Sequence, residues 1–358
     1  MNDRAPRFLI VRLGSLGDVI HAIPAVAALK HRYPGGTIDW VVDPRYAELV
    51  RLVTVVGSVY PFDPRGALSA LTAWRRLRAA RFHLRAARYG GQVGAQGPSD
   101  SGIEYDAVID LQGLLKSAVL ARSIGARRTI GFSRRHLREP MARFFYSETV
   151  DPGDAPHVIQ KGIGLMRAVG VDDPSIAFPI AVPRSNAADA VAARVGSSGY
   201  MLINPGAAWP NKRWPAARFG ALAAAIRERR GLRSVVLWGP GEEAAAAAVV
   251  ASSGGAADQA PATSITDILA IAKGASLMVS GDTGPLHIAG AVGTPIVALF
   301  GPTRAERNGP WSPADISISR IDQCVCHYER RCRRAQPCID DIGVDDVVAA
   351  VERRVAAR

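Results

Sequence analysis

One segment near the C-terminal end of the chain constrains its fold more than any other. An apolar run at 275–279 leads into the glycine-rich turn 281–284; a helix of small residues is predicted next, and a second apolar run follows at 296–300. The first turn of a helix offers free N–H groups and a positive dipole end to a phosphate. The segment therefore predicts the strand–turn–helix–strand unit of a nucleotide-binding α/β domain. The alternative is an ordinary βαβ crossover, with Asp282 as the helix N-cap and His287 on the helix surface.

The rest of the chain repeats this alternation in two halves, and its 358 residues are enough for two domains. Further apolar runs lie at 8–13, 38–42, 107–111, 200–204 and 234–238. Strands that alternate with helices predict parallel, doubly wound sheets. A segment rich in proline and acidic residues separates the halves, so we predict one Rossmann-like domain at 1–175 and another at 176–358. Residues 64–104 interrupt the alternation with a basic helix and a Gly/Ser/Gln-rich loop.

The chain carries an excess of arginine. Its formal net charge is +12, and much of the excess lies in two clusters, 74–85 and 122–143. Such clusters attract phosphates on a glycan, an anionic lipid or a nucleic acid, whereas the alternative is a solvated basic face. No nucleic-acid-binding module is recognisable, so we expect no nucleic-acid partner. The N-terminus lacks an apolar signal segment and no run is long enough to span a bilayer, so we expect a cytoplasmic protein.

All four cysteines lie close together near the C-terminus. They are Cys324, Cys326, Cys332 and Cys338. A cytoplasmic chain seldom keeps disulfides, which leaves a reduced structural loop or a bound metal. The spacing C-x-C-x5-C-x5-C is not that of a standard zinc finger, so both alternatives stay open.

Three turns in the second half carry side chains that suit a single ligand. Lys212 and Arg213 supply positive charge before a predicted helix, and Glu242 has a carboxylate suited to two ribose hydroxyls. The turn after 275–279 suits phosphates. Ligands of such sheets bind at the carboxyl ends of the strands, so these groups predict a site for a nucleotide diphosphate-sugar. The alternative for Lys212 and Glu242 is ordinary surface exposure.

Asp18 is the candidate catalyst of the first half. It follows a Gly-x-x-Gly turn at the start of a helix predicted from about Val19 to His31. There it suits a general base that takes a proton from an attacking hydroxyl, and its alternative role is that of a helix N-cap.

Several motifs then occur in one order along nearly the whole chain. They are Arg12-Leu13-Gly14-Ser15-Leu16-Gly17-Asp18-Val19-Ile20-His21, Gln112-Gly113-Leu114-Leu115-Lys116-Ser117, Arg138-Glu139-Pro140, Asn204-Pro205-Gly206-Ala207, Lys212-Arg213-Trp214-Pro215 and Asp282-Thr283-Gly284-Pro285-Leu286-His287. With them the chain resembles glycosyltransferase family 9, the bacterial ADP-heptose:lipopolysaccharide heptosyltransferases. The second and third motifs look most like heptosyltransferase I, which adds the first heptose to the Kdo region of lipid A.

This resemblance implies an α/β GT-B fold, in which two Rossmann-like domains face a cleft, and an inverting mechanism with no metal and no cofactor. The N-terminal domain would bind the acceptor and the C-terminal domain the nucleotide-sugar. Asp18 matches the general base and Lys212 the lysine that neutralises the donor diphosphate. The implied donor-binding residues are Lys212, Arg213, Glu242, Asp282, Thr283, Gly284 and His287. The implied acceptor-binding residues are Gly17, Lys116, Arg134, Arg135 and Arg138.

The leading hypothesis is therefore an inverting transferase that moves heptose from ADP-heptose to Kdo-lipid A. It would act in lipopolysaccharide inner-core biosynthesis, on the cytoplasmic face of the inner membrane, as a peripheral protein at an anionic surface. One alternative is a family member that adds the second heptose or another sugar. A second alternative is a catalytically inactive nucleotide-sugar-binding protein.

Overall fold

The structure, a computed structural model, describes residues 4–63, 105–172 and 175–357. The chain divides into two compact units, Met1–Ala181 and Val182–Arg358. The predicted insertion at 64–104, which includes the first arginine cluster, lies outside the described residues. Within the described part, no helix combines the length and the apolar character needed to cross a membrane.

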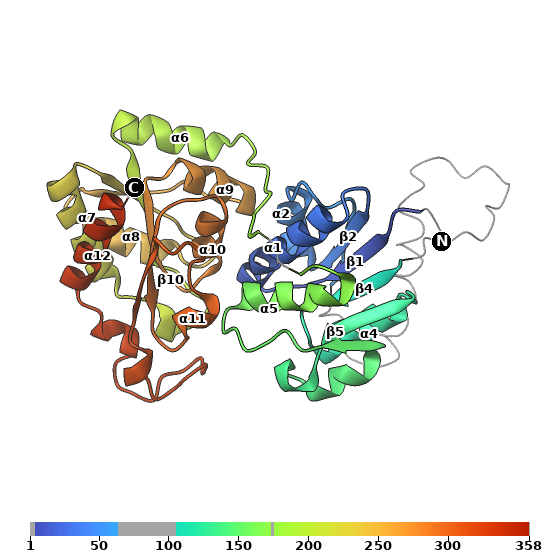
Figure 1. Cartoon of the computed structure of the whole chain (residues 1–358). Helices are drawn as coiled ribbons and strands as arrows, with labels where there is room; N and C mark the ends of the chain where they lie inside the picture. The colour runs from blue at the N-terminus through green and yellow to red at the C-terminus, as the bar shows by residue number, and fades with distance from the viewer. Residues whose placement is uncertain (1–3, 64–104, 173–174, 358) are drawn as a thin grey trace. The chain divides into compact units, whose positions relative to one another are not determined.

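The described part of the first unit is built on one six-stranded sheet with helices packed against it (Figure 1). The strands are parallel in the order β3-β2-β1-β4-β5-β6. In chain order the elements are β1 (Arg7–Val11), α1 (Leu16–Arg32), β2 (Thr37–Val42), η1 (Pro44–Tyr46), α2 (Ala47–Arg51), β3 (Val59–Pro61), β4 (Ala107–Asp110), α4 (Leu115–Ser123), β5 (Arg128–Phe132), η3 (Arg134–His136), η4 (Pro140–Phe145), β6 (Glu148–Val150), α5 (Val158–Leu165) and η5 (Met166–Val169).

The second unit repeats this plan with the strand order β12-β11-β10-β7-β8-β9. Its elements are α6 (Asn186–Val195), η6 (Gly196–Ser198), β7 (Tyr200–Asn204), η7 (Pro210–Lys212), α7 (Ala216–Arg230), β8 (Arg233–Val236), α8 (Glu243–Ala251), β9 (Ala257–Gln259), α9 (Ile265–Gly274), β10 (Leu277–Gly281), α10 (Gly284–Ala291), β11 (Ile296–Phe300), α11 (Ala305–Asn308), β12 (Ile316–Ser319), η8 (Ile321–Gln323), η9 (Cys338–Asp341) and α12 (Val344–Ala356). If the strands of each unit are numbered from its own first strand, both orders read 3-2-1-4-5-6, which is the Rossmann order.

Strand residues of the second sheet alternate between two buried faces. Ile203, Val279 and Leu299 point to the face covered by α7, α8 and α12, where they form one core with the apolar side chains of these helices. The neighbouring strand positions are buried on the opposite face, on the side of α9 and α10 (Figure 1). A parallel sheet covered on both faces leaves its strand ends as the place where a ligand can approach.

Two helix starts differ from the sequence prediction. α1 begins at Leu16 rather than at Val19, because the Asp18 carboxylate accepts hydrogen bonds from the backbone N–H (3.0 Å) and the hydroxyl (2.9 Å) of Ser15. Ser15, and not Asp18, is therefore the N-cap of α1. In the second unit the N-cap of α10 is Thr283, so the alternative that placed Asp282 there is wrong.

A buried carboxylate fixes the region after β4. Asp110 is fully buried and accepts hydrogen bonds from the hydroxyls of Ser117 (2.8 Å) and Tyr146 (2.7 Å). The backbone N–H groups of Gln112 (2.8 Å) and Gly113 (3.2 Å) also donate to it. Burial raises the pKa of Asp110 in spite of these four donors. One carboxylate thus ties the end of β4, the first turn of α4 and the end of η4 together.

We expect Tyr146→Phe to lower the free energy of unfolding by about 1–3 kcal/mol, because a buried acceptor loses one donor while the ring remains. The ring should stay in place, since it packs directly against Gly131. Urea unfolding of the variant checks this, with Tyr328→Phe, at an exposed ring, as the control. Equal midpoints for the two variants would show that the Tyr146 hydroxyl does not anchor η4.

Candidate active site

The loops that follow β7, β10 and β11 meet at the buried carboxylate of Asp282. Its Oδ2 accepts hydrogen bonds from the ammonium of Lys212 (2.6 Å) and from the hydroxyl of Thr303 (2.8 Å). The side chain of Asp282 is only 4% exposed and that of Lys212 only 14%. A buried charge needs a partner of opposite sign, so Asp282 holds the ammonium at the carboxyl edge of the sheet.

His287 completes this cluster from the first helical turn of α10. Its Nε2 lies 3.3 Å from Oδ1 of Asp282. Burial alone would raise the pKa of Asp282, but the hydrogen bond from His287 and the charge of Lys212 outweigh burial and hold the pKa below the ordinary carboxyl range. A carboxyl with a lowered folded-state pKa stabilises the fold above its unfolded pKa. That contribution is lost as the pH falls through the folded-state value.

The loop that carries Lys212 lies directly on the phosphate-type turn. A Cβ added at Gly281 would lie 2.7 Å from the carbonyl oxygen of Lys212, so only glycine allows this approach. The ammonium also lies 4.8 Å from the ring centroid of Trp209, within the range of a cation–π contact. An ammonium has three N–H donors, and the described hydrogen bond to Asp282 uses one of them.

Thr283 and Arg213, both predicted to bind the donor, have partners within the protein. The Thr283 hydroxyl lies 3.2 Å from the side-chain nitrogen of Asn204 and 3.1 Å from the hydroxyl of Ser280. The guanidinium of Arg213 donates to the carbonyl of Ala207 (2.8 Å) and so closes the loop between them. Gly284 is the first residue of α10, where the backbone N–H groups are free of helical partners.

Glu242 lies across the turn after β7. It ends the turn after β8, and its Oε2 accepts a hydrogen bond from the backbone N–H of Gly239 (3.1 Å). A Cβ added at Gly206 would lie only 2.0 Å from the same oxygen, so the carboxylate rests on the backbone of Gly206. Since β7 and β8 are neighbours, Glu242 and the Lys212–Asp282 cluster lie at one edge of the sheet.

In the first unit Asp18 has partners on both carboxylate oxygens. Oδ1 lies 2.6 Å from the guanidinium of Arg12, and Oδ2 accepts the two hydrogen bonds from Ser15. The Asp18 side chain is 31% exposed, so solvent still reaches it. Gly17, its neighbour in α1, is buried. The sequence therefore placed Asp18 at the right strand end, but its role in capping is that of the third helical residue.

The other predicted acceptor-binding residues follow the neighbouring strands of the same sheet. Lys116 lies in the first turn of α4, after β4, and is exposed. Arg134 and Arg138 follow β5 and are exposed as well. Arg135 is engaged by acidic neighbours: its guanidinium lies 2.6 Å from Asp151 and 3.4 Å from Asp154. Because β1, β4 and β5 are adjacent and parallel, these cations and Asp18 share the carboxyl edge of the first sheet.

Sequence reasoning missed two residues of these clusters. Arg12 pairs with Asp18 and also donates to the carbonyl of Leu111, and Thr303 donates to Asp282. Both lie where a strand ends, one directly after β1 and the other three residues after β11. The rule that polar residues at parallel strand ends converge would have found them.

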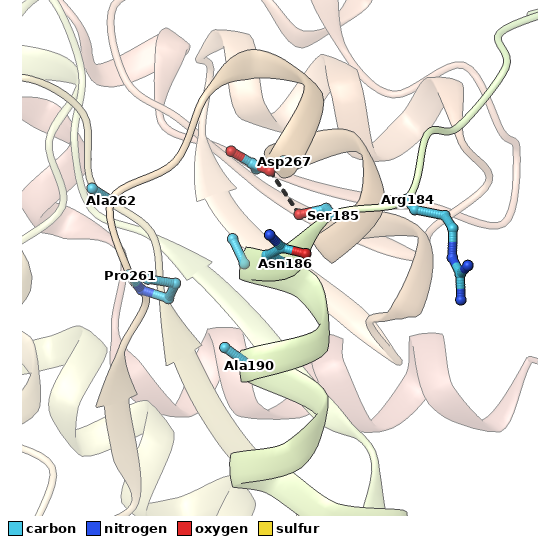
Figure 2. Close-up of a pocket in the computed structure, with 8 residues that line it drawn as sticks. Arg184, Ser185, Asn186, Ala190, Pro261, Ala262 and Asp267 are labelled. Atoms are coloured by element: carbon cyan, nitrogen blue, oxygen red, sulfur yellow. Dashed lines mark hydrogen bonds between the residues drawn. The ribbon is translucent and has the colours of Figure 1, made fainter.

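An open pocket of about 600 Å³ lies away from this edge cluster, between the start of α6 and the loop after β9. Figure 2 shows the hydroxyl of Ser185, the N-cap of α6, donating to Asp267 at 2.7 Å on one side of it. Pro261 and Ala262 line the other side. None of the predicted site residues line this pocket, so it does not mark the active site.

The four cysteines gather into one small cluster. Cys326 Sγ lies 3.7 Å from Cys324 Sγ and 3.1 Å from Cys332 Sγ, and all four thiols are free. Burial and the neighbouring thiols raise the pKa of Cys338 to about 12, which keeps it protonated. In the part of the chain that the structure describes, no three His, Cys, Asp or Glu side chains are arranged to hold a metal ion.

Comparison with known proteins adds family and fold. The model of glycosyltransferase family 9 (heptosyltransferase) matches residues 101–337. Lipopolysaccharide heptosyltransferase 1 of Pseudomonas aeruginosa is 30% identical over 336 residues, which cover 94% of this chain and 89% of that protein.

Two solved structures share the fold. The glycosyl transferase family 9 protein from Veillonella parvula DSM 2008 matches with a TM-score of 0.81 and 21% identity, over 100% of this chain and 99% of its own. E. coli heptosyltransferase WaaC with ADP matches with a TM-score of 0.75 and 23% identity, over 97% of this chain and 99% of its own. The predicted fold class, GT-B with two Rossmann-like domains, is confirmed.

The contact between Glu242 and Gly206 gives a test of the predicted ribose contact. We expect Gly206→Ala to push the carboxylate away and to weaken ADP binding about 10- to 100-fold, the value of one hydrogen bond to a charged group. Calorimetric titration with ADP measures it. Gly35→Ala is the control, since a Cβ there makes an ordinary 3.8 Å contact.

A double-mutant cycle separates this effect from a general loss of structure. In a Glu242→Ala background, Gly206→Ala should cost little further affinity, because no carboxylate remains to be displaced. Additive losses would contradict the proposed contact.

Proposed function

We propose a specific reaction for this chain, which belongs to glycosyltransferase family 9 (heptosyltransferase) and is a glycosyltransferase: transfer of heptose from ADP-heptose to the Kdo region of lipid A. Transfer of heptose in lipopolysaccharide core biosynthesis follows from the family. The choice of the first heptose is supported by the 30% identical relative, which is named lipopolysaccharide heptosyltransferase 1.

The observation that carries the proposal is the pair of Lys212 and Asp282 at the start of α10. Negative charge develops on the diphosphate as its bond to the sugar breaks. A fixed ammonium and the free amides at Thr283 and Gly284 stabilise that charge without reorganising, because they are already in place. Asp282, held by Thr303 and His287, keeps the ammonium of Lys212 from turning into solvent.

Asp18 is proposed as the general base. Its carboxylate takes the proton from the acceptor hydroxyl as that oxygen attacks the anomeric carbon of the donor. A single displacement of this kind inverts the anomeric centre. Arg12, ion-paired to one oxygen of Asp18, fixes the orientation of the carboxylate at the end of β1.

The acceptor is proposed to bind along the carboxyl edge of the first sheet. Lipid A carries phosphates and Kdo carries a carboxylate, and the exposed cations Lys116, Arg134 and Arg138 suit both groups. We place the site of action at the anionic cytoplasmic face of the inner membrane, where a chain of net charge +12 is attracted electrostatically.

Two other functions are separable by experiment. Incubation with ADP-heptose and Kdo2-lipid A should release ADP and yield a heptosylated acceptor. Transfer only to an acceptor that already carries one heptose would indicate addition of the second heptose. Donor binding without ADP release from either acceptor would indicate an inactive nucleotide-sugar-binding protein.

Replacing Asp18 by Asn should lower kcat about 10²- to 10⁴-fold, since a positioned general base is lost, and should leave the Kd for ADP nearly unchanged. Steady-state kinetics and calorimetry measure the two quantities.

The chain offers a matched control for the capping role of Asp18. Asp267 accepts hydrogen bonds from the N–H (2.9 Å) and the hydroxyl (2.7 Å) of Ser264 in the same helical position. Asp18→Asn and Asp267→Asn should each cost about 1 kcal/mol of stability, but only the first should stop turnover. If both variants keep kcat, Asp18 is a capping residue alone.

Turnover should persist in excess EDTA, because Lys212 and the amides of α10 supply the positive charge that a divalent cation brings in other transferases. ADP release with EDTA, and after adding back magnesium or zinc, measures it. Activity lost in EDTA and restored by magnesium would overturn the mechanism. Restoration by zinc alone would point to a structural metal at the four cysteines.

A further inference from the structure

Exposed apolar side chains gather on one part of the first unit. Among the described residues, the two most exposed large apolar side chains are Phe144 (71%) and Met141 (62%), both in η4. Leu115 at the start of α4 is 41% exposed. The N–H of Leu115 donates to the carboxylate of Glu139 (2.7 Å), which joins the start of α4 to the start of η4. Contiguous exposed apolar groups of this kind usually mark an interaction surface.

The periodicity of η4 explains why two apolar side chains share one outward face. A 3₁₀ helix has three residues per turn, so positions 141 and 144 lie above one another. Positions 142 and 145 form the inward face, where Ala142 is fully buried and Phe145 packs against the core. Tyr146, hydrogen-bonded to buried Asp110, fixes the end of the helix. The outward face is therefore rigid, and Met141 and Phe144 cannot turn inward.

Basic residues surround this apolar face. Lys116, Arg134, Arg138 and Arg143 are exposed on α4, η3, η4 and the segment between η3 and η4. Glu139 is occupied by the N–H of Leu115, and Asp151 and Asp154 pair with Arg135. The surface is thus an apolar centre with a cationic rim, the pattern by which peripheral proteins bind the headgroup region of anionic bilayers.

We infer that this surface, which we call the η4 face (Leu115, Met141 and Phe144 with the basic rim), docks on an anionic lipid bilayer and inserts Met141 and Phe144 among the headgroups. The inference rests on the proposed function, because a lipid-anchored acceptor has to be met at a membrane. Charge complementarity selects the occupant: a cationic rim repels a second copy of the same rim and attracts anionic lipid. Met141 and Phe144 would then bring the acceptor edge of the first sheet to the membrane surface.

Vesicle binding tests the inference directly. The double variant Met141→Ser/Phe144→Ser should bind vesicles of phosphatidylglycerol and phosphatidylcholine about 10- to 100-fold more weakly than the parent chain, because two apolar side chains no longer leave water. The control Val182→Ser/Val325→Ser removes two exposed apolar side chains of the second unit and should bind as the parent does. Arg143→Gln should weaken binding at low salt and have less effect at high salt.

A second measurement reports insertion without removing the apolar group. The variant Phe144→Trp should show a blue-shifted emission increment with anionic vesicles, and lipids brominated near the headgroup should quench it. Unchanged binding of the serine variant, equal loss in the control, or no quenching would overturn the inference. A change in oligomeric state of the serine variant would overturn it as well, because it would assign the η4 face to a second copy of the chain.

The outcome is separable from that of the proposed reaction. With a water-soluble, deacylated Kdo acceptor, the serine variant should keep the parent's kcat and KM, while its KM for vesicle-embedded acceptor should rise. A parent chain that transfers heptose to neither acceptor would refute the proposed function, and the vesicle-binding comparison would still decide the docking surface.

Discussion

A carboxylate buried beside the sheet of the second unit is the constraint on which the donor side of the molecule depends. Asp282 cannot stay ionised without partners, and its partners come from three loops: Lys212 from the loop after β7, His287 from α10 and Thr303 from the loop after β11. Satisfying one charge therefore brings together loops that are far apart in the sequence. The cation is kept at the strand ends without its own dedicated helix or metal, and the phosphate-type turn of α10 lies next to it.

The first unit has a buried carboxylate in the equivalent strand, and the contrast shows how one scaffold serves two purposes. Asp110 ends β4 as Asp282 follows β10, and both strands are the fourth of their unit and pair with its first strand. Asp110 receives only neutral donors, so burial dominates and raises its pKa; Asp282 faces an ammonium and an imidazole, which lower its pKa. The neutral set makes a structural anchor, whereas the charged set presents a cation at the sheet edge.

Long apolar runs and glycine turns were sufficient to predict the two parallel sheets and most of the helices. The short strands β3, β6 and β9 were not predicted, because three residues are too few for a periodic pattern and their pairing is set by the neighbouring strand. The sequence also placed Lys212, Glu242 and Asp282 at strand ends, as parallel topology requires. It did not predict the ion pair of Lys212 with Asp282 or the contact of Glu242 with Gly206. These contacts depend on how loops of separate strands cross, which no local pattern encodes.

The donor side is also tied to the last part of the chain, and this sets the order in which it can form during synthesis. Asn211, beside Lys212, donates to the carbonyl of Glu329, and the indole of Trp214 donates to the carbonyl of Ile342. A chain emerging N-terminus first can complete its first unit while the second is still being made. The loop of Lys212 obtains these fixed partners only when the cysteine-containing segment and η9 have left the ribosome. A nascent chain therefore acquires its acceptor side early and its donor side only at the end of translation.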